Sequence, residues 1–427
     1  MPDSSAATAS GPARPEVIAW RNAIFVIFML PGLAIASWVA RLPAIRDVLD
    51  VGPAQLGFLI FAIAAGSIGG LAASSHVVAR IGSARTIDWG IISTVVGLCV
   101  AGVGSTVGPN FAVVFGGLVL FGAANGMTDV AMNVSGAANE RSLGRSIMPV
   151  FHAFFSFGTM LGAALGALAE LFGVPIAEHF GLISVIIVGA LFAARRFVQP
   201  DLPLAGRSTA DQEQPVPAST WRSRLSIWRD PRTLLIGLLV LGAAFAEGSA
   251  NDWIAIAAVD GHGVSNTTGA LVFGLFVTAM TAGRLGGVFV IDRFGRVPVL
   301  RGSFILAAVG LLIFISVPVV PIAIAGALLW GLGSALGFPI GMSAAADDPA
   351  TAAARVSAVA TIGYFAFLVG PPVIGLLGQS VGVLNALLVT LVLVAVGAIV
   401  APAAREPRAA PPRNTVIDAN VDVADAG

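Results

Sequence analysis

Lysine is absent from this sequence of 427 residues, and charged residues of every kind are scarce. Its 23 arginines are balanced by 23 acidic residues, and the zero net charge argues against a nucleic-acid partner. Charged residues make up 11% of the chain, compared with roughly 25% in soluble domains. Because 57% of the residues are apolar, too little polar surface remains to cover a water-soluble protein of this size. The composition therefore predicts an integral membrane protein.

Residues that could perform catalysis or bind metals are also few. The single cysteine, Cys99, excludes an intramolecular disulfide and a cysteine metal site. The four histidines, His76, His152, His179 and His262, show no metal-ligand spacing. Without lysine there is no Gly-rich phosphate-binding motif, and Gly-x-Ser-x-Gly does not occur in a nucleophile-elbow setting. We therefore expect no enzyme activity, no metal, no cofactor and no ATP-driven transport.

The apolar residues are gathered into twelve long runs. A spanning helix needs about 20 mostly apolar residues, and twelve such helices in a soluble protein would leave no outer polar layer. We therefore expect an all-α integral membrane fold with twelve transmembrane helices. The runs cover roughly residues 20–40, 54–78, 86–106, 110–138, 148–171, 179–197, 232–257, 267–290, 298–317, 320–345, 354–378 and 382–402.

The arginines are distributed unevenly between the two sides of this arrangement. If the amino terminus is inside, all but three of the 23 arginines fall in inside segments. The exceptions are Arg41 and Arg46 in an outside loop and Arg284 within a helix. Positive charge collects on the cytoplasmic side of membrane proteins, so we expect a multi-pass protein of the plasma (inner) membrane with both termini cytoplasmic.

The chain divides into five parts by composition. Two tails, residues 1–19 and 403–427, are rich in small and polar residues and are expected to be disordered and cytoplasmic. The six-helix halves cover residues 20–197 and 232–402. Residues 198–231 contain several prolines and arginines and are expected to form a cytoplasmic linker between the halves.

The two halves resemble each other in sequence. Arg80-Ile81-Gly82 matches Arg293-Phe294-Gly295 at an offset of 213 residues. Two six-helix repeats of the same topology are a transporter architecture, with the substrate path between the halves near the middle of the membrane. Further matches keep offsets of 209 to 215: Gly57 with Gly269, Phe61 with Phe273, Phe121-Gly122 with Trp330-Gly331, Arg145 with Arg355, and Trp38 with Trp253.

The loop after the eighth run carries a family resemblance. Asp292-Arg293-Phe294-Gly295-Arg296 resembles the loop signature of the major facilitator superfamily, over a chain segment of about residues 20–402. The first-half copy keeps Arg80 and Gly82 but has Ala79 where the acid is expected, and Gly287 lies five residues before Asp292, which departs from the signature's spacing. The resemblance implies a secondary transporter in which these residues help to close the cytoplasmic gate, here from one side only. The alternative is a charged turn without a gating role.

A second segment narrows the resemblance. Residues 126–133, from Gly126 to Asn133, together with Glu140-Arg141 and Phe151-His152, resemble the YbjJ-like branch of the superfamily, which is distantly similar to fucose permeases. This branch is a weak guide to the substrate.

The first half contains polar residues at membrane depth. Ionisable residues there are costly to insert and are functional candidates by default. Asn125, Asp129 and Asn133 are spaced i, i+4 and i+8, which places them on one helix face that we expect to form a cavity wall or a helix contact. His152 on the next helix either pairs with this face, carries protons or donates to a backbone carbonyl.

The second half contributes Glu247 and Asn251, which share a helix face at i, i+4, and Tyr364, a candidate for the cavity lining. Burial favours the neutral form of a carboxyl group, so Glu247 is a candidate for proton binding. Two alternatives remain open for Arg284, which either pairs with Glu247 or extends to the inside surface. Asp252 lies closer to the outside and is expected to reach water.

Trp38 and Arg41, at the end of the first run, have the residue types of membrane-interface anchors.

Three classes of function remain. We expect a secondary transporter of a small solute that works by alternating access, is coupled to protons and is a monomer in the lipid bilayer. Its alternatives are a proton-coupled efflux pump for drugs or metabolites, and a non-transporting membrane sensor on the same fold. A membrane-embedded enzyme would need acids or histidines clustered at one face, and these are missing. The substrate and the direction of transport do not follow from the sequence.

Overall fold

The computed structural model describes residues 14–144, 147–199, 227–348 and 351–406. Within these residues the secondary structure is helical throughout, and twelve helical segments are long and apolar enough to cross a membrane. The predicted tails, 1–19 and 403–427, and the predicted linker, 198–231, lie largely outside the described residues.

The helix boundaries agree with the predicted runs to within a few residues, and the predicted twelve-helix membrane fold is confirmed. The elements are α1 (Arg14–Ala40), α2 (Leu42–Leu49), α3 (Pro53–Ile81), α4 (Ser83–Thr106), α5 (Phe111–Leu143), α6 (Met148–Leu171), α7 (Ile176–Arg195), α9 (Pro231–His262), α10 (Asn266–Phe294), α11 (Arg296–Ser316), α12 (Val320–Ser334), α13 (Gly337–Ala345), α14 (Ala352–Val381), α15 (Val383–Ala386), α16 (Leu388–Val400) and the 3-10 helix η1 (Ala401–Ala404).

Several helices begin at side chains that accept hydrogen bonds from the first free amide groups. The Asn110 side chain accepts from the amides of Ala112 and Val113 at the start of α5. Asp230 accepts from the amides of Arg232 and Thr233 at the start of α9. Such caps satisfy amide groups that have no partner inside the helix, and they fix where each span begins.

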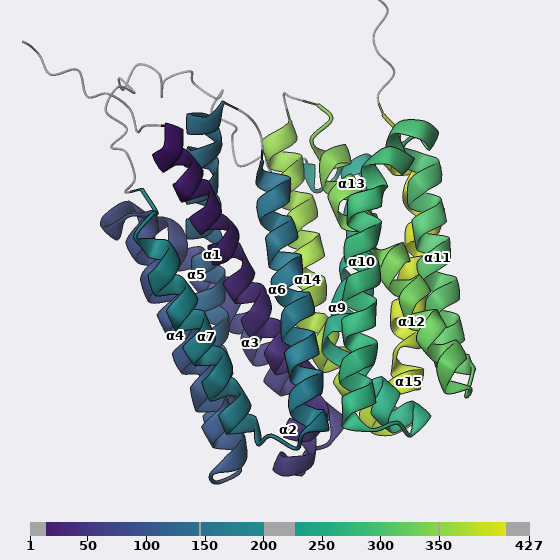
Figure 1. The fold of residues 1–427 in the computed structure, drawn as a ribbon. Helices are drawn as coiled ribbons and strands as arrows, with labels where there is room; N and C mark the ends of the chain where they lie inside the picture. The colour runs from purple at the N-terminus through teal and green to yellow at the C-terminus, as the bar shows by residue number, and fades with distance from the viewer. Residues whose placement is uncertain (1–13, 145–146, 200–226, 349–350, 407–427) are drawn as a thin grey trace, which may run out of the picture.

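The two halves lie side by side in the bundle, with α1 to α7 on one side and α9 to α16 on the other (Figure 1). They meet along two helix pairs, α3 with α14 and α6 with α10. Glycine permits the close approach of the first pair. A Cβ on Gly57 would lie 2.6 Å from the Pro371 carbonyl oxygen, and one on Gly375 would lie 2.6 Å from that of Pro53.

The bundle has two ends that differ in how the halves meet. We call the end at which α1 begins and the described chain finishes the terminal face, and the other end the opposite face (Figure 1). At the opposite face the short helix α2 contacts α9 and α10 of the other half. Arg46 on α2 forms an ion pair with Asp260 of α9, and Asp47 accepts a hydrogen bond from Asn266 at 3.2 Å. These contacts close the opposite face.

The end of α1 does not anchor the protein in the membrane interface, so that prediction is wrong. Trp38 is buried and contacts the ring of Phe180 on α7. Arg41, only 4% exposed, pairs with Glu170 at 2.7 Å and donates to the Val174 carbonyl at 2.8 Å. The sequence pattern failed here because the acid that neutralises Arg41 comes from the distant helix α6.

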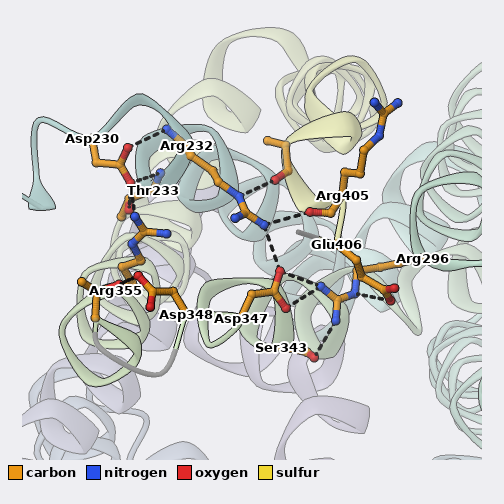
Figure 2. Close-up of polar contacts among 12 residues, drawn as sticks. Asp230, Arg232, Thr233, Arg296, Ser343, Asp347, Asp348, Arg355, Arg405 and Glu406 are labelled. Atoms are coloured by element: carbon orange, nitrogen blue, oxygen red, sulfur yellow. Dashed lines mark hydrogen bonds and ion pairs between the residues drawn. The ribbon is translucent and has the colours of Figure 1, made fainter. Parts of the chain in front are cut away.

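A cluster of charged side chains ties the elements of the second half together at the terminal face (Figure 2). Asp347, directly after α13, accepts hydrogen bonds from Arg232 at 2.9 Å and from Arg296 at 2.8 and 3.0 Å. Arg232 also donates to the carbonyls of Ala403 and Arg405 near the end of the described chain. The starts of α9 and α11 are thereby joined through the Asp347 carboxylate, and Arg232 holds the end of the described chain against them.

A second charged contact lies beside this cluster. Asp230 pairs with Arg355 at 3.2 Å and accepts from the Thr233 hydroxyl at 2.7 Å. The Thr233 hydroxyl, followed by the charge of Arg355, lowers the pKa of Asp230. A carboxyl whose pKa is lower in the folded state adds stability above its unfolded pKa and loses it as the pH falls through the folded value. This contact therefore persists at neutral pH and weakens only in acid.

Candidate functional site

A cavity of about 640 Å³ lies between the two halves. Its wall is formed by α1, α3 and α6 from the first half and by α9, α10 and α14 from the second. Tyr364 and Phe365 of α14 line this cavity and are nevertheless exposed. The ion pair and hydrogen bond that join the halves within the described residues lie at the opposite face, so we infer that the cavity opens toward the terminal face.

An ion pair crosses the part of the wall that belongs to the second half. Arg284 of α10 donates to Glu247 of α9 at 2.8 Å, and both side chains line the cavity. Their exposed fractions are 36% and 18%, so the pair is only partly removed from water. Of the two alternatives for Arg284, the structure has the pairing with Glu247 and not the extension to the surface.

Two further predicted residues lie beside this pair. Asn251, one turn after Glu247 on α9, and Tyr364 on α14 both line the cavity. Thus all four candidates from the second half are brought to one wall. Helical periodicity explains this grouping for Glu247 and Asn251, whereas Arg284 and Tyr364 reach the wall through the packing of α10 and α14 against α9.

The polar stripe of the first half lies outside the cavity lining. Asn133 donates to the Asp129 carbonyl at 2.8 Å and to its carboxylate at 3.3 Å, so both residues are engaged on α5 itself. Asn125 is partly buried, and its side-chain amide nitrogen has no hydrogen-bond partner among the described residues.

Asp129 and His152 are both exposed and interact electrostatically with each other. Across the space between the halves, Asp129 also interacts with Tyr364, and His152 with Arg284. His152 lies about 6 Å along α6 from the helix start at the terminal face. His152 therefore lies beside the cavity, toward the terminal face.

The loop signature forms a sharp turn in both halves. Gly82 and Gly295 end α3 and α10 with φ of 84° and 79°, a region that favours glycine. Arg80, Asp292 and Arg293 are exposed.

The charged residues of this loop differ in their contacts. Asp292 has no hydrogen bond or ion pair within the described ranges. Arg296, by contrast, is held by Asp347 in the charged cluster of Figure 2. In this arrangement Arg296 therefore has a structural contact, while Asp292 is free.

Asp252 lines the cavity. The expectation that it reaches water near the outside stays a prediction. Asp252 follows Glu247 by five residues and so leaves the helix face on which the i, i+4 pattern placed the site. The available signal was the density of polar side chains in this segment, which contains Glu247, Ser249, Asn251 and Asp252.

Comparisons with known proteins agree with the fold and with the loop signature. A sequence profile described as Major Facilitator Superfamily matches residues 250–421. An uncharacterised transporter of Sinorhizobium fredii is 30% identical over 84% of this chain and 91% of its own length. An uncharacterised MFS-type transporter of Yersinia pestis is 30% identical over 82% of this chain and 87% of its own.

Among solved structures, an inward-facing, unoccupied bacterial homologue of the human lysosomal transporter Spinster superposes with a TM-score of 0.69. It is 13% identical, and the match covers 93% of this chain and all of the other, so the likeness is one of fold. The assignment to the YbjJ-like branch stays a prediction.

Proposed function

Because this chain belongs to the major facilitator superfamily, whose members are transporters and not enzymes, we propose that it is a proton-coupled secondary transporter of a small solute. One observation carries the proposal. A cavity lies between the two halves, which α2 joins at the opposite face, and a charged pair, Glu247 and Arg284, lies in its wall. Alternating access needs such a cavity between two repeats that move against each other.

The coupling follows from the exchange of partners at this pair. An ion pair in a partly dry wall is stable only while both charges are present. A proton on Glu247 removes one charge and leaves the Arg284 guanidinium free to interact with other groups in the cavity. Asp129, which faces His152 near the open end, is a second place where a proton can enter. In this scheme protonation changes the relative free energies of the two gate states.

Two other functions use the same fold. Proton-coupled efflux of a drug or metabolite differs only in the direction of flux, and a non-transporting sensor would bind a solute without moving it. Flux in reconstituted vesicles separates them. A solute that raises the melting temperature of the purified protein should be exchanged across proteoliposomes and accumulate when a pH gradient is imposed. Binding without exchange would support the sensor and reject the transporter. Exchange that does not respond to the pH gradient would reject proton coupling.

The gate proposal concerns Asp292. In the superfamily the acid of this loop signature helps to lock the cytoplasmic gate. In an arrangement whose opposite face is closed, a lock for the terminal face is expected to be open, and the free Asp292 carboxylate is consistent with that. We infer that Asp292 gains a partner only when the terminal face closes. Since Ala79 replaces the acid in the first half, this lock is one-sided.

For the orientation, we propose that the terminal face is cytoplasmic in the plasma membrane, because most arginines lie at that end. Cysteines placed at two exposed positions, Ser142 at the terminal face and Gly108 at the opposite face, test this in a Cys99→Ala background. In intact cells an impermeant maleimide should label Gly108→Cys and should label Ser142→Cys only after lysis. The reverse pattern would show that the orientation is inverted.

A further inference from the structure

Asp252 is an acidic residue in the cavity that the coupling scheme does not use. It lies about 7.5 Å along α9 from Glu247, on the side of the closed opposite face, at the blind end of the cavity. Within the described part of the chain it has neither an ion pair nor a hydrogen bond. Arg284, the cation of the cavity wall, is already paired with Glu247.

An ionised carboxylate in such a place has a large energetic cost. Removing an isolated charge from water costs several kcal/mol unless a counter-charge or hydrogen-bond donors meet it. The charged side chains that line the cavity are Glu247, Asp252 and Arg284, which leaves one negative charge in excess when all are ionised. When Asp252 is ionised, the described chain offers it no counter-charge, and a bound cation is one source of it.

Three hydroxyl groups of the cavity already donate to backbone carbonyls and so are not donors to Asp252. Ser67 donates to the Gly122 carbonyl at 3.1 Å, Thr159 to that of Phe155 at 3.1 Å, and Thr361 to that of Ser357 at 2.8 Å. Their oxygens remain as acceptors, because a hydroxyl donates only one hydrogen. These three oxygens can therefore accept hydrogen bonds from a ligand that brings donors of its own.

The remaining wall is apolar and aromatic. Trp38 and Val39 of α1 and Ile60 of α3 line the cavity, together with Phe155 of α6 and Phe367 of α14. Aromatic faces attract a cation, and apolar side chains favour the hydrocarbon body of a ligand. A carboxyl group without a partner among the described residues and aromatic side chains in one cavity suit the same kind of molecule.

We propose that the cavity binds a small organic cation whose ammonium group donates to Asp252 and whose body lies against the aromatic and apolar wall. This inference rests on the proposed transport function and names the class of its substrate. A neutral polyol would leave the charge of Asp252 without a counter-charge. An anionic solute would meet an uncompensated carboxylate while the guanidinium of Arg284 is occupied.

Binding of three molecules of matched shape tests this proposal: phenethylamine, 2-phenylethanol and 3-phenylpropanoate, which are cationic, neutral and anionic at pH 7. Calorimetry and thermal unfolding of the purified full chain measure their binding. The amine should bind best, and Asp252→Asn should weaken it at least tenfold while leaving the weak binding of the alcohol unchanged. Asp252→Glu should retain most of the binding of the amine. Asp50→Asn, at an exposed position where asparagine suits the left-handed backbone, is the matched control and should bind like the unchanged protein.

The outcomes separate this inference from the transport proposal. Equal binding of amine and alcohol, no binding of the amine, or amine binding that survives Asp252→Asn would overturn the cation site, whatever the vesicle flux shows. If the Asp252→Asn variant does not fold, the Asp252→Glu variant is used instead. Binding of the amine to that variant that is no tighter than binding of the alcohol would also overturn the cation site. Conversely, amine binding that depends on Asp252, together with flux that ignores an imposed pH gradient, keeps the site and rejects the proton coupling.

Discussion

Replacement of Glu247 by glutamine is expected to abolish accumulation of solute driven by a pH gradient while exchange of solute across the membrane continues. Glutamine keeps the size of the side chain and can still accept a hydrogen bond from Arg284, but it cannot bind and release a proton. Because Glu247 is partly exposed to the cavity, its carboxylate is accessible to water from the open face. The measurement is uptake into proteoliposomes with and without an imposed gradient. Glu178→Gln, on the exposed start of α7, is the control.

A static ion pair predicts a different result for the same variant. If Glu247 serves only to neutralise Arg284, Glu247→Gln should lower the melting temperature, and adding Arg284→Met should partly restore it. The coupling role then passes to Asp129, whose asparagine variant is assayed in parallel. Wild-type pH dependence in both Asp129→Asn and Glu247→Gln would disprove the coupling scheme.

Replacement of Asp347 by asparagine is expected to produce the largest loss of stability. Asp347 is 10% exposed and accepts from two guanidinium groups, those of Arg232 and Arg296 (Figure 2). Breaking a buried pair costs about 3–5 kcal/mol, and because Arg232 is partly exposed we expect roughly 1–3 kcal/mol here. Thermal unfolding in detergent should show a clear fall in midpoint, with the second half of the chain cleaved first by added protease.

The matched control is Glu406→Gln, which removes a weaker partner of the same Arg296. Glu406 is 69% exposed and lies 3.8 Å from Arg296, and exposed pairs contribute at most about 1 kcal/mol. If Asp347→Asn lowers the melting midpoint no more than Glu406→Gln does, the cluster adds nothing to the stability of the second half.

The sequence predicted the membrane fold well because each span is specified locally. A run such as residues 298–317 needs only its own hydropathy and length to be assigned, and α11 follows it closely. The repeat of the two halves was visible because Gly82 and Gly295 serve the same turn. By contrast, Arg46 and Asp260 are 214 positions apart, and no local pattern connects them.

In the candidate site, too, local patterns were predicted and contacts between distant helices were not. Glu247 and Asn251 were placed together because helical periodicity puts residues i and i+4 on one face. The pairing of Glu247 with Arg284 stayed open, since it depends on how α9 and α10 pack. Asp252 was left out of the predicted site because it lies off the helix face that Glu247 and Asn251 share. The charged cluster around Asp347 was not foreseen, because its members come from separate elements.

The distance between the two halves at each membrane face tests alternating access most directly. Spin labels in a Cys99→Ala background at Val107 and Val319 report on the opposite face, and labels at Ser142 and Gly302 report on the terminal face, all at exposed positions. Double electron–electron resonance in lipid vesicles at pH 5.5 and pH 8 should show the two pairs changing in opposite directions, one face opening as the other closes. Asp292→Asn should enrich the population that is open at the terminal face. Distances that stay fixed at both faces, or that widen and narrow together, would contradict the account.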